Sequence, residues 1–157
     1  MRLIYICCFL MILGLQSKTY AQMQWKSLDS LQSKLLNEEI EKPIFIFFTA
    51  NWCVYCQKMK QAAFQSPKLV KILESNYFSV EIDVHYPESI QLSHYTFKNS
   101  GIGYYRRPFH DLALQLAQRS QDQFSLPFLV ILNPDLSVQR RAFSYLSPKQ
   151  LMLFLQH

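Results

Sequence analysis

The feature that most constrains this chain is a pair of cysteines at the point where an apolar segment gives way to a helical pattern. Residues 44–48 read Ile-Phe-Ile-Phe-Phe, and this unbroken run of strand formers predicts a strand buried on both faces. A short turn follows, and Cys53 and Cys56 then stand at the start of a helical pattern that extends to about residue 64. The sequence therefore predicts a strand that delivers two thiols to the N-terminus of a helix.

This position suits thiol chemistry. The free N–H groups of a first helical turn, together with the helix dipole, favour negative charge, so we expect Cys53 to ionise readily and to be the nucleophile. Cys56 lies three residues further on, a separation that places two side chains on one face of a turn and allows a small disulfide ring to close. We therefore expect Cys56 to resolve the mixed disulfide that Cys53 forms with a substrate.

The first 21 residues have the pattern of a secretory signal peptide. Arg2 precedes an apolar run over residues 3–15, and Thr-Tyr-Ala at 19–21 is a small-x-small cleavage site before Gln22. The run is shorter than the roughly 20 residues that a membrane span needs, which favours cleavage over anchoring. We expect a signal peptide at 1–21, one domain at 22–157, and a mature protein in the periplasm or outside the cell.

Removing the signal peptide also simplifies the cysteine count. Cys7 and Cys8 would leave with it, so Cys53 and Cys56 would be the only cysteines. An exported protein without further cysteines has no structural disulfide framework, so the pair is expected to serve redox chemistry or metal binding. The net charge falls from +5 to +3 once Arg2 and Lys18 are removed, which gives no reason to expect nucleic-acid binding.

The rest of the chain alternates between helical and strand patterns. Apolar spacing predicts a first helix over residues 25–40, and Ser66 and Pro67 are typical of the cap and first residue of another. Further helices are expected at 89–95, 110–119 and 148–156, the last capped by Ser147. Further strands are expected at 78–84, 128–132 and 138–143, with a turn at 133–135 and a loop at 98–109.

Residues 50–59, which hold Trp52 before Cys53-Val-Tyr-Cys56 and then Lys58 and Met59, resemble the active-site segment of the thioredoxin superfamily. Leu126-Pro127 before a strand resembles the cis-proline site of that family, residues 133–135 its following hairpin turn, and residues 145–151 the start of its last helix. The closest likeness is to secreted bacterial thioredoxin-like proteins and to the C-terminal domain of the periplasmic disulfide reductase. The resemblance implies an α/β, thioredoxin-like three-layer sandwich, with a central mixed sheet flanked by helices.

The same resemblance implies a protein thiol–disulfide oxidoreductase that needs no cofactor besides its own redox-active disulfide. The expected partners are protein or peptide disulfides and a membrane-embedded thiol reductase that donates electrons, and the protein is expected to be a monomer. The bond before Pro127 should be cis, and Trp52 should shield one side of the thiol. The expected catalytic residues are Cys53 and Cys56, and the expected substrate-binding residues are Trp52, Val54, Tyr55, Leu126 and Pro127.

Two departures from the family pattern affect the mechanism. Phe47 stands where thioredoxins carry a buried acid that helps to deprotonate the resolving cysteine. Deprotonation of Cys56 must then rely on water, on the geometry of the mixed disulfide, or on another acid such as Glu81 or Asp83. For these two acids we favour structural roles, at a strand edge and as a strand-end cap, over a role in proton transfer. Val54 and Tyr55 match neither the Gly-Pro of thioredoxins nor the Pro-His of strong periplasmic oxidants. Because no histidine precedes Cys56 to stabilise a thiolate, we expect a reductant.

Three alternatives remain open at the level of sequence. The same site could run as an oxidase or isomerase, or the fold could serve only to bind a peptide or copper, since thiolates suit Cu(I). The histidines fall at no recognisable ligand spacing and are expected at the surface or at helix ends; they are His85, His94, His110 and His157. The loop from Gly101 to Arg107 is interpreted as a solvated turn, with a partner-binding rim as the alternative.

Overall fold

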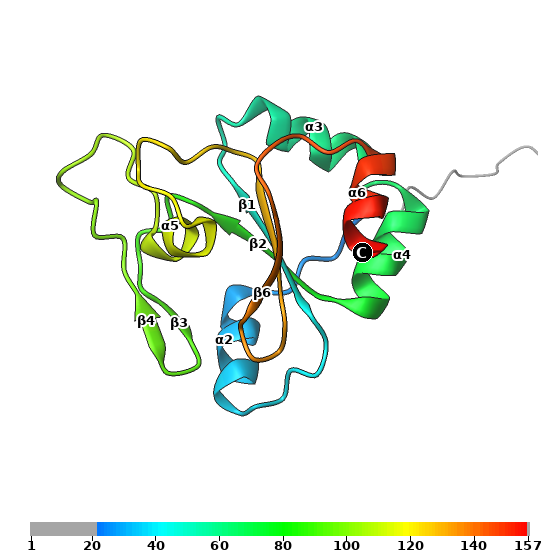
Figure 1. The fold of residues 1–157 in the computed structure, drawn as a ribbon, viewed down its shortest axis with the longest axis horizontal. Coiled ribbons are helices and arrows are strands. Elements are labelled where there is room, and N and C mark those ends of the chain that lie inside the picture. The colour runs from blue at the N-terminus through cyan, green and yellow to red at the C-terminus, as the bar shows by residue number, and fades with distance from the viewer. Residues whose placement is uncertain (1–21, 157) are drawn as a thin grey trace, which may run out of the picture.

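A four-stranded mixed sheet forms the centre of the fold in the computed structural model, which describes residues 22–156 (Figure 1). The predicted signal peptide at 1–21 lies outside the described residues. β1 (Ile44–Thr49) runs parallel to β2 (Phe78–Asp83) and antiparallel to β5 (Phe128–Leu132), and β6 (Val138–Ala142) pairs with the other edge of β5. The strand order is β2-β1-β5-β6, so β1 lies inside the sheet, and all six of its residues are buried.

Helices cover both faces of this sheet, which confirms the expected three-layer α/β sandwich. Arg140 of β6 donates to the carbonyl of Phe154 on one face, and Arg141 donates to the carbonyl of Leu116 on the other. Because neighbouring residues of a strand point to opposite faces, α5 and α6 must lie on opposite sides (Figure 1). The helices are α2 (Leu28–Leu36), α3 (Val54–Ala62), α4 (Pro67–Asn76), α5 (Asp111–Ala117) and α6 (Pro148–Gln156).

Aromatic side chains fill the core on each face of β1. On one face, the ring of Phe47 lies 5.9 Å from that of Trp25 and 5.0 Å from that of Phe64. On the other face, Phe48 stacks on Phe128 with 5.3 Å between ring centroids. Since a fully buried aromatic side chain contributes several kcal/mol to stability, this packing fixes the strand that leads to the cysteines.

Several predicted boundaries need correction. The first helix begins at Leu28, because Lys26 is extended and bridges to Val80 of β2, and it ends at Leu36, just before Glu38 adopts a left-handed conformation with φ of 56°. The helix predicted at 110–119 ends at Ala117, because Gln118 has φ of 54°. The remaining predicted elements agree with the structure to within about two residues, apart from segment 89–95.

The prediction of a helix at 89–95 is wrong. This segment forms most of an antiparallel hairpin of β3 (Ile90–Leu92) and β4 (Tyr95–Phe97). Ile90 and Leu92 are buried and Gln91 is exposed, which is the period-two pattern of a strand. The hairpin is also bonded to α2, because the Gln91 backbone N–H donates to the side-chain oxygen of Gln32 at 2.7 Å.

The hairpin, the loop at 98–109 and α5 together form an inserted segment between β2 and β5, hereafter the insertion (residues 84–125). Its first residue is bonded to the end of β1, from Val84 N–H to Thr49 O at 2.9 Å, and two backbone hydrogen bonds within the insertion hold the start of α5, from His110 N–H to Val84 O at 2.7 Å and from Asp111 N–H to Lys98 O at 3.0 Å. The 98–109 loop lies at the end of the molecule that also carries the turn between β1 and α3 (Figure 1). The insertion therefore reaches the region of the cysteines.

Within residues 22–156, no helix combines the length and the apolar character that crossing a bilayer would require.

Candidate active site

The two cysteines occupy the first turn of α3 and are joined by a disulfide. Cys53 is the N-cap of the helix, the position where Ser, Thr, Asp or Asn usually supplies an accepting oxygen, and here its sulfur accepts the N–H of Cys56 at 3.1 Å. The Cα atoms lie 5.2 Å apart. Because the first turn of α3 contains no acidic residue, nothing in that turn opposes a thiolate on Cys53.

The turn from β1 to α3 places the disulfide at the end of the buried strand. Cys53 N–H donates to Ala50 O, and Gln57 N–H donates to Cys53 O, both at 3.1 Å. Cys53 is 4% exposed and Cys56 is fully buried, whereas Val54 and Tyr55 between them are 76% and 59% exposed. The sulfurs are thus recessed behind two protruding side chains, and Cys53 is the more accessible cysteine.

The peptide bond between Leu126 and Pro127 is cis, as the resemblance implies. Phe48 of β1 pairs with Phe128 of β5 in an antiparallel register, so Pro127 lies beside the last residue of β1, where the turn to Cys53 begins. Pro127 is buried and Leu126 is half-buried. The register thereby brings a segment that is more than 70 residues away in sequence to the edge of the disulfide turn.

The acid that thioredoxins use near the resolving cysteine has no direct counterpart at its usual position. Phe47 is fully buried in the aromatic cluster. Glu81, opposite it on β2, forms an ion pair with Lys60, and the Asp83 carboxylate accepts the His85 N–H at 2.8 Å. Both acids therefore have polar partners other than a cysteine, which agrees with the favoured interpretation of them as structural residues.

Trp52 borders the disulfide and is held by a histidine from the insertion. Its indole N–H donates to His85 Nε2 at 2.9 Å, and the other ring nitrogen of His85, Nδ1, lies 2.8 Å from the carbonyl oxygen of Pro108. Since a carbonyl only accepts, Nδ1 carries the proton and Nε2 is the acceptor. This neutral tautomer satisfies both ring nitrogens and fixes the indole, which remains 42% exposed.

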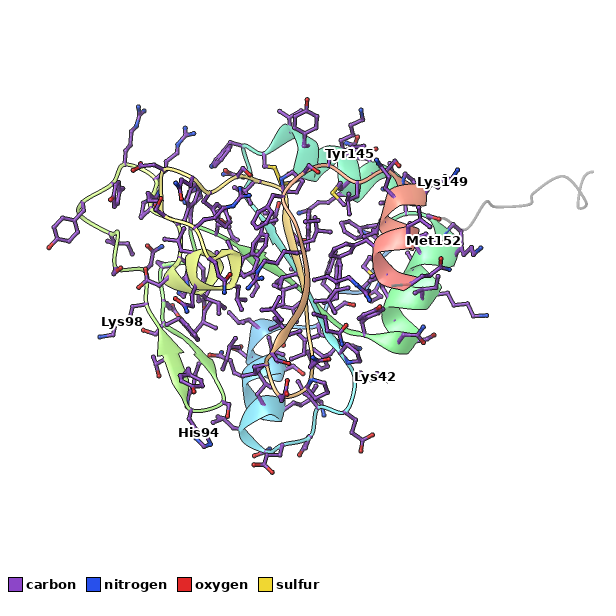
Figure 2. The ribbon with its side chains drawn as sticks, in the orientation of Figure 1. Lys42, His94, Lys98, Tyr145, Lys149 and Met152 are labelled. Carbon is purple, nitrogen blue, oxygen red and sulfur yellow. A yellow bond between two sulfur atoms is a disulfide. The ribbon has the colours of Figure 1, made fainter. Side chains whose placement is uncertain are left out.

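Cations lie over aromatic rings on both sides of the disulfide. On the Trp52 side, the Arg107 guanidinium lies 5.6 Å from the indole centroid. On the Tyr55 side, the ring of Tyr55 lies 6.2 Å from that of Tyr145, and Lys58 Nζ lies 4.9 Å from the same Tyr145 ring. Figure 2 shows Tyr145 close to α3 and α6. The disulfide thus lies between two aromatic and cationic flanks that come from different parts of the chain.

Of the three histidines in the described residues, His94 and His110 lie where the sequence predicts, at the surface and at a helix end, and His85 does not. His85 is half-buried beside Trp52, and His110 is fully buried; only the exposed His94, at the hairpin tip, is a surface residue (Figure 2). His110 does lie at a helix end, as predicted, because its Nδ1 accepts the Leu112 N–H at 3.2 Å and caps α5. Its Nε2 donates to Glu88 O at 3.0 Å, and burial lowers the pKa of its imidazole below the usual value.

No cluster of three or more His, Cys, Asp or Glu side chains within residues 22–156 has an arrangement that could hold a metal ion. His157 lies outside the described residues. The copper hypothesis therefore gains no support from the described part of the chain.

Sequence reasoning missed two residues of the site, His85 and Arg107. His85 is the second residue after β2, and because β2 runs parallel to β1, their carboxyl ends meet at one edge of the sheet. That topological argument could have placed His85 near Trp52. Arg107 lies in the 98–109 loop, for which the sequence predicts a solvated turn or a partner-binding rim, and its guanidinium lies over the Trp52 indole.

A CxxC disulfide on the first turn of a helix, beside a cis-proline and within a mixed sheet, defines a protein of the thioredoxin fold. Residues 25–134 match the model of a family described as thioredoxin-like, which covers more than half of the chain. The chain belongs to this thioredoxin-like family. A comparison with curated protein sequences found no match.

Solved structures with the same fold cover most of the chain. A protein titled DsbH oxidoreductase is 19% identical, with a TM-score of 0.53 over 91% of this chain and 90% of its own. A thioredoxin from Thermus thermophilus is 17% identical, with a TM-score of 0.57 over 86% of this chain and 85% of its own. The reduced C-terminal domain of Neisseria meningitidis DsbD is 16% identical, with a TM-score of 0.52 over 82% and 91%. At these identities the likeness establishes the fold.

Proposed function

We propose that the protein is a thiol–disulfide oxidoreductase that acts outside the cytoplasm and reduces protein disulfides. One observation carries the proposal: Cys53 caps α3, its sulfur accepts the Cys56 N–H, and the two sulfurs form a disulfide. A sulfur held at a helix N-terminus is a good place for a thiolate. A partner sulfur three residues away can then attack the mixed disulfide and release the substrate.

The reaction conserves atoms and electrons in two exchange steps. The Cys53 thiolate attacks one sulfur of a substrate disulfide, forms a mixed disulfide, and displaces the other substrate sulfur as a thiolate that takes up a proton. The Cys56 thiolate then attacks the Cys53 sulfur and displaces the second substrate thiolate. The substrate disulfide gains two electrons, and the Cys53–Cys56 dithiol is oxidised to the disulfide present in the structure.

The proton of Cys56 needs an acceptor in the second step. Phe47 offers none, and Glu81 and Asp83 are engaged with Lys60 and with the His85 backbone. Cys56 is fully buried in the disulfide form. We therefore assign deprotonation to water that reaches Cys56 while the mixed disulfide is open, so the second step should be the slower one.

The residues between the cysteines support the direction of reduction. Val54 and Tyr55 carry no positive charge, and the first helical turn contains no histidine that could stabilise the Cys53 thiolate. A less stabilised thiolate makes the dithiol form less favourable and the pair more reducing. Sustained reduction in an oxidising compartment needs an electron donor, so we also propose a membrane-embedded thiol reductase as partner.

The placement outside the cytoplasm rests on the signal-peptide pattern of residues 1–21 and on the cysteine count. With that segment removed, Cys53 and Cys56 are the only cysteines. The exchange site then has no other thiol in the chain with which to form a wrong disulfide.

A trapping experiment tests this function. Cys56→Ser should accumulate a mixed disulfide with a substrate or donor, because Cys53 attacks but nothing resolves the product. The adduct should run as a larger band on a non-reducing gel and vanish with dithiothreitol. Cys53→Ser is the matched control and should trap little, because Cys56 is buried. Equal trapping by both variants, or no trapping by either, would contradict the assigned roles.

A further inference from the structure

A surface hollow beside the disulfide carries an arginine that no group in the described chain neutralises. The hollow has a volume of about 570 Å³ and is lined by Asn51, Trp52, His85 and Arg107. Two of these residues immediately precede Cys53, and the other two come from the insertion. A substrate whose sulfur reaches Cys53 therefore passes next to this hollow.

Of the two basic side chains in the hollow, only Arg107 is free to bind a ligand by charge. Both ring nitrogens of His85 are used, one by the Trp52 indole and one by the Pro108 carbonyl. The ion pairs among residues 22–156 are Lys34–Glu39 and Lys60–Glu81, so Arg107 has no carboxylate partner in this part of the chain. Its guanidinium lies over the indole, where its N–H groups can still donate at the edge.

Hydrogen bonds hold the backbone at and after Arg107 in place, although the loop is exposed. Gln121 donates its side-chain N–H to Arg107 O at 3.0 Å and accepts the Phe109 N–H at 3.0 Å. His85 is bonded to Pro108 O, and its ring stacks on Phe109 with 5.5 Å between centroids. Three consecutive residues are thus fixed, so Arg107 is presented to the hollow by a supported segment.

We infer that this hollow is a subsite for a carboxylate close to the reacting cysteine of a substrate polypeptide. The inference rests on the proposed function and specifies its substrates: disulfides with an aspartate or glutamate beside the cysteine. A planar guanidinium with free donors binds a carboxylate in a bidentate manner. The exposed Val54 and Tyr55 on the other side of the recessed disulfide offer contact to a chain longer than a single thiol.

The test compares two peptides in a single-turnover reaction with the reduced protein. Both are end-blocked, contain one cysteine as a mixed disulfide with 2-thiopyridine, and differ only in having Asp or Asn on both sides of that cysteine. Attack of Cys53 on the peptide sulfur releases 2-thiopyridone, which is followed by absorbance. Rates with dithiothreitol on the same peptides correct for their intrinsic reactivity.

The wild-type protein should prefer the Asp peptide by about threefold to fivefold, the size of effect that one partly exposed ion pair produces. Arg107→Gln should reduce that preference, the ratio of the Asp rate to the Asn rate, to about one, whatever it does to the two rates together. Arg106→Gln is the matched control, because Arg106 is the exposed neighbour in the same loop and does not line the hollow. It should keep the preference.

Three results would overturn the inference. The first is an equal rate for both peptides with the wild-type protein, and the second is an equal loss of preference in both arginine variants. The third uses glutathione disulfide as an additional substrate: if Arg107→Gln slowed its reduction but left the peptide preference intact, the hollow would be assigned to a small anionic thiol. Failure of the proposed function looks different, because the wild-type protein would then release 2-thiopyridone from neither peptide.

Discussion

The central sheet and the insertion contribute different parts of the site. The sheet positions the sulfurs through buried packing and backbone register: β1 ends at the disulfide turn, and β5 brings Pro127 beside it. The insertion reaches the same turn through the side chains of His85 and Arg107 at a partly exposed surface. Under the proposed function, the sheet supports the exchange reaction and the insertion supports its selectivity.

The largest expected effect concerns stability in the core. Phe47→Ala should lower the free energy of unfolding by about 3–5 kcal/mol, the usual cost of removing a buried phenylalanine, because Phe47 is fully buried between Trp25 and Phe64. Phe97→Ala in the half-buried hairpin is the matched change in the insertion and should cost less than half as much. Urea unfolding followed by circular dichroism measures both, and equal costs would remove the contrast.

A smaller effect, confined to acid pH, should come from His110 in the insertion. Burial lowers its folded-state pKa, so between that value and the unfolded value of about 6.5 the unfolded chain binds more protons. Stability should therefore be fully present above pH 7 and should decline as the pH falls through about 6.5.

His110→Asn tests this pH dependence, because asparagine can still cap α5 but does not titrate. The variant should lose less stability than the wild-type protein between pH 7 and pH 5, as measured by urea unfolding at each pH. The idea fails if the two proteins show the same loss over this range.

The hydrogen bond between Trp52 and His85 should matter less for stability. His85→Ala should cost about 1 kcal/mol, the typical net value of one hydrogen bond, and should slow attack by Cys53 a few-fold because the indole is no longer fixed. His94→Ala, at the hairpin tip far from α3 (Figure 2), is the control and should change neither quantity. An equal response of both variants would show that Trp52 does not depend on His85.

The smallest effect is expected on the Tyr55 side of the disulfide. Lys58→Gln removes an exposed cation over Tyr145, and such contacts are weak at the surface. The rate of attack should change by less than twofold, and the preference for Asp over Asn peptides should persist. If Lys58→Gln instead abolished that preference, selectivity would belong to the whole positive surface rather than to the insertion.

The core strand and the position of the cysteine pair were predictable because their signals are local. The run at 44–48 and the Cys53–Cys56 spacing each point to one element, and the structure has a strand and a helix N-terminus there. The cis bond before Pro127 was expected only from the family resemblance, because few X-Pro bonds are cis. The insertion was harder, since short strands such as β3 carry only three residues of alternation. Helix ends were also missed where a residue such as Gln118 adopts a left-handed conformation, which its side chain does not signal.

The roles of His85 and Arg107 depend on tertiary contacts. His85 reaches Trp52 across 33 positions of sequence, and Arg107 depends on the brace from Gln121. Neither residue has a neighbouring pattern that distinguishes it from a surface side chain. The parallel pairing of β1 and β2 could place His85 near Trp52, but its hydrogen bond, and the position of Arg107, follow only from the packing of the two segments against each other.

The reduction potential of the Cys53–Cys56 pair tests the central claim most directly. The protein would be equilibrated in buffers of oxidised and reduced glutathione, and the fraction of disulfide would be measured by thiol labelling. A reductant predicts a value near that of thioredoxin, about −270 mV, whereas a value near that of the strong periplasmic oxidant, about −120 mV, would reverse the direction. A pair that formed no disulfide at any ratio would contradict the exchange mechanism itself.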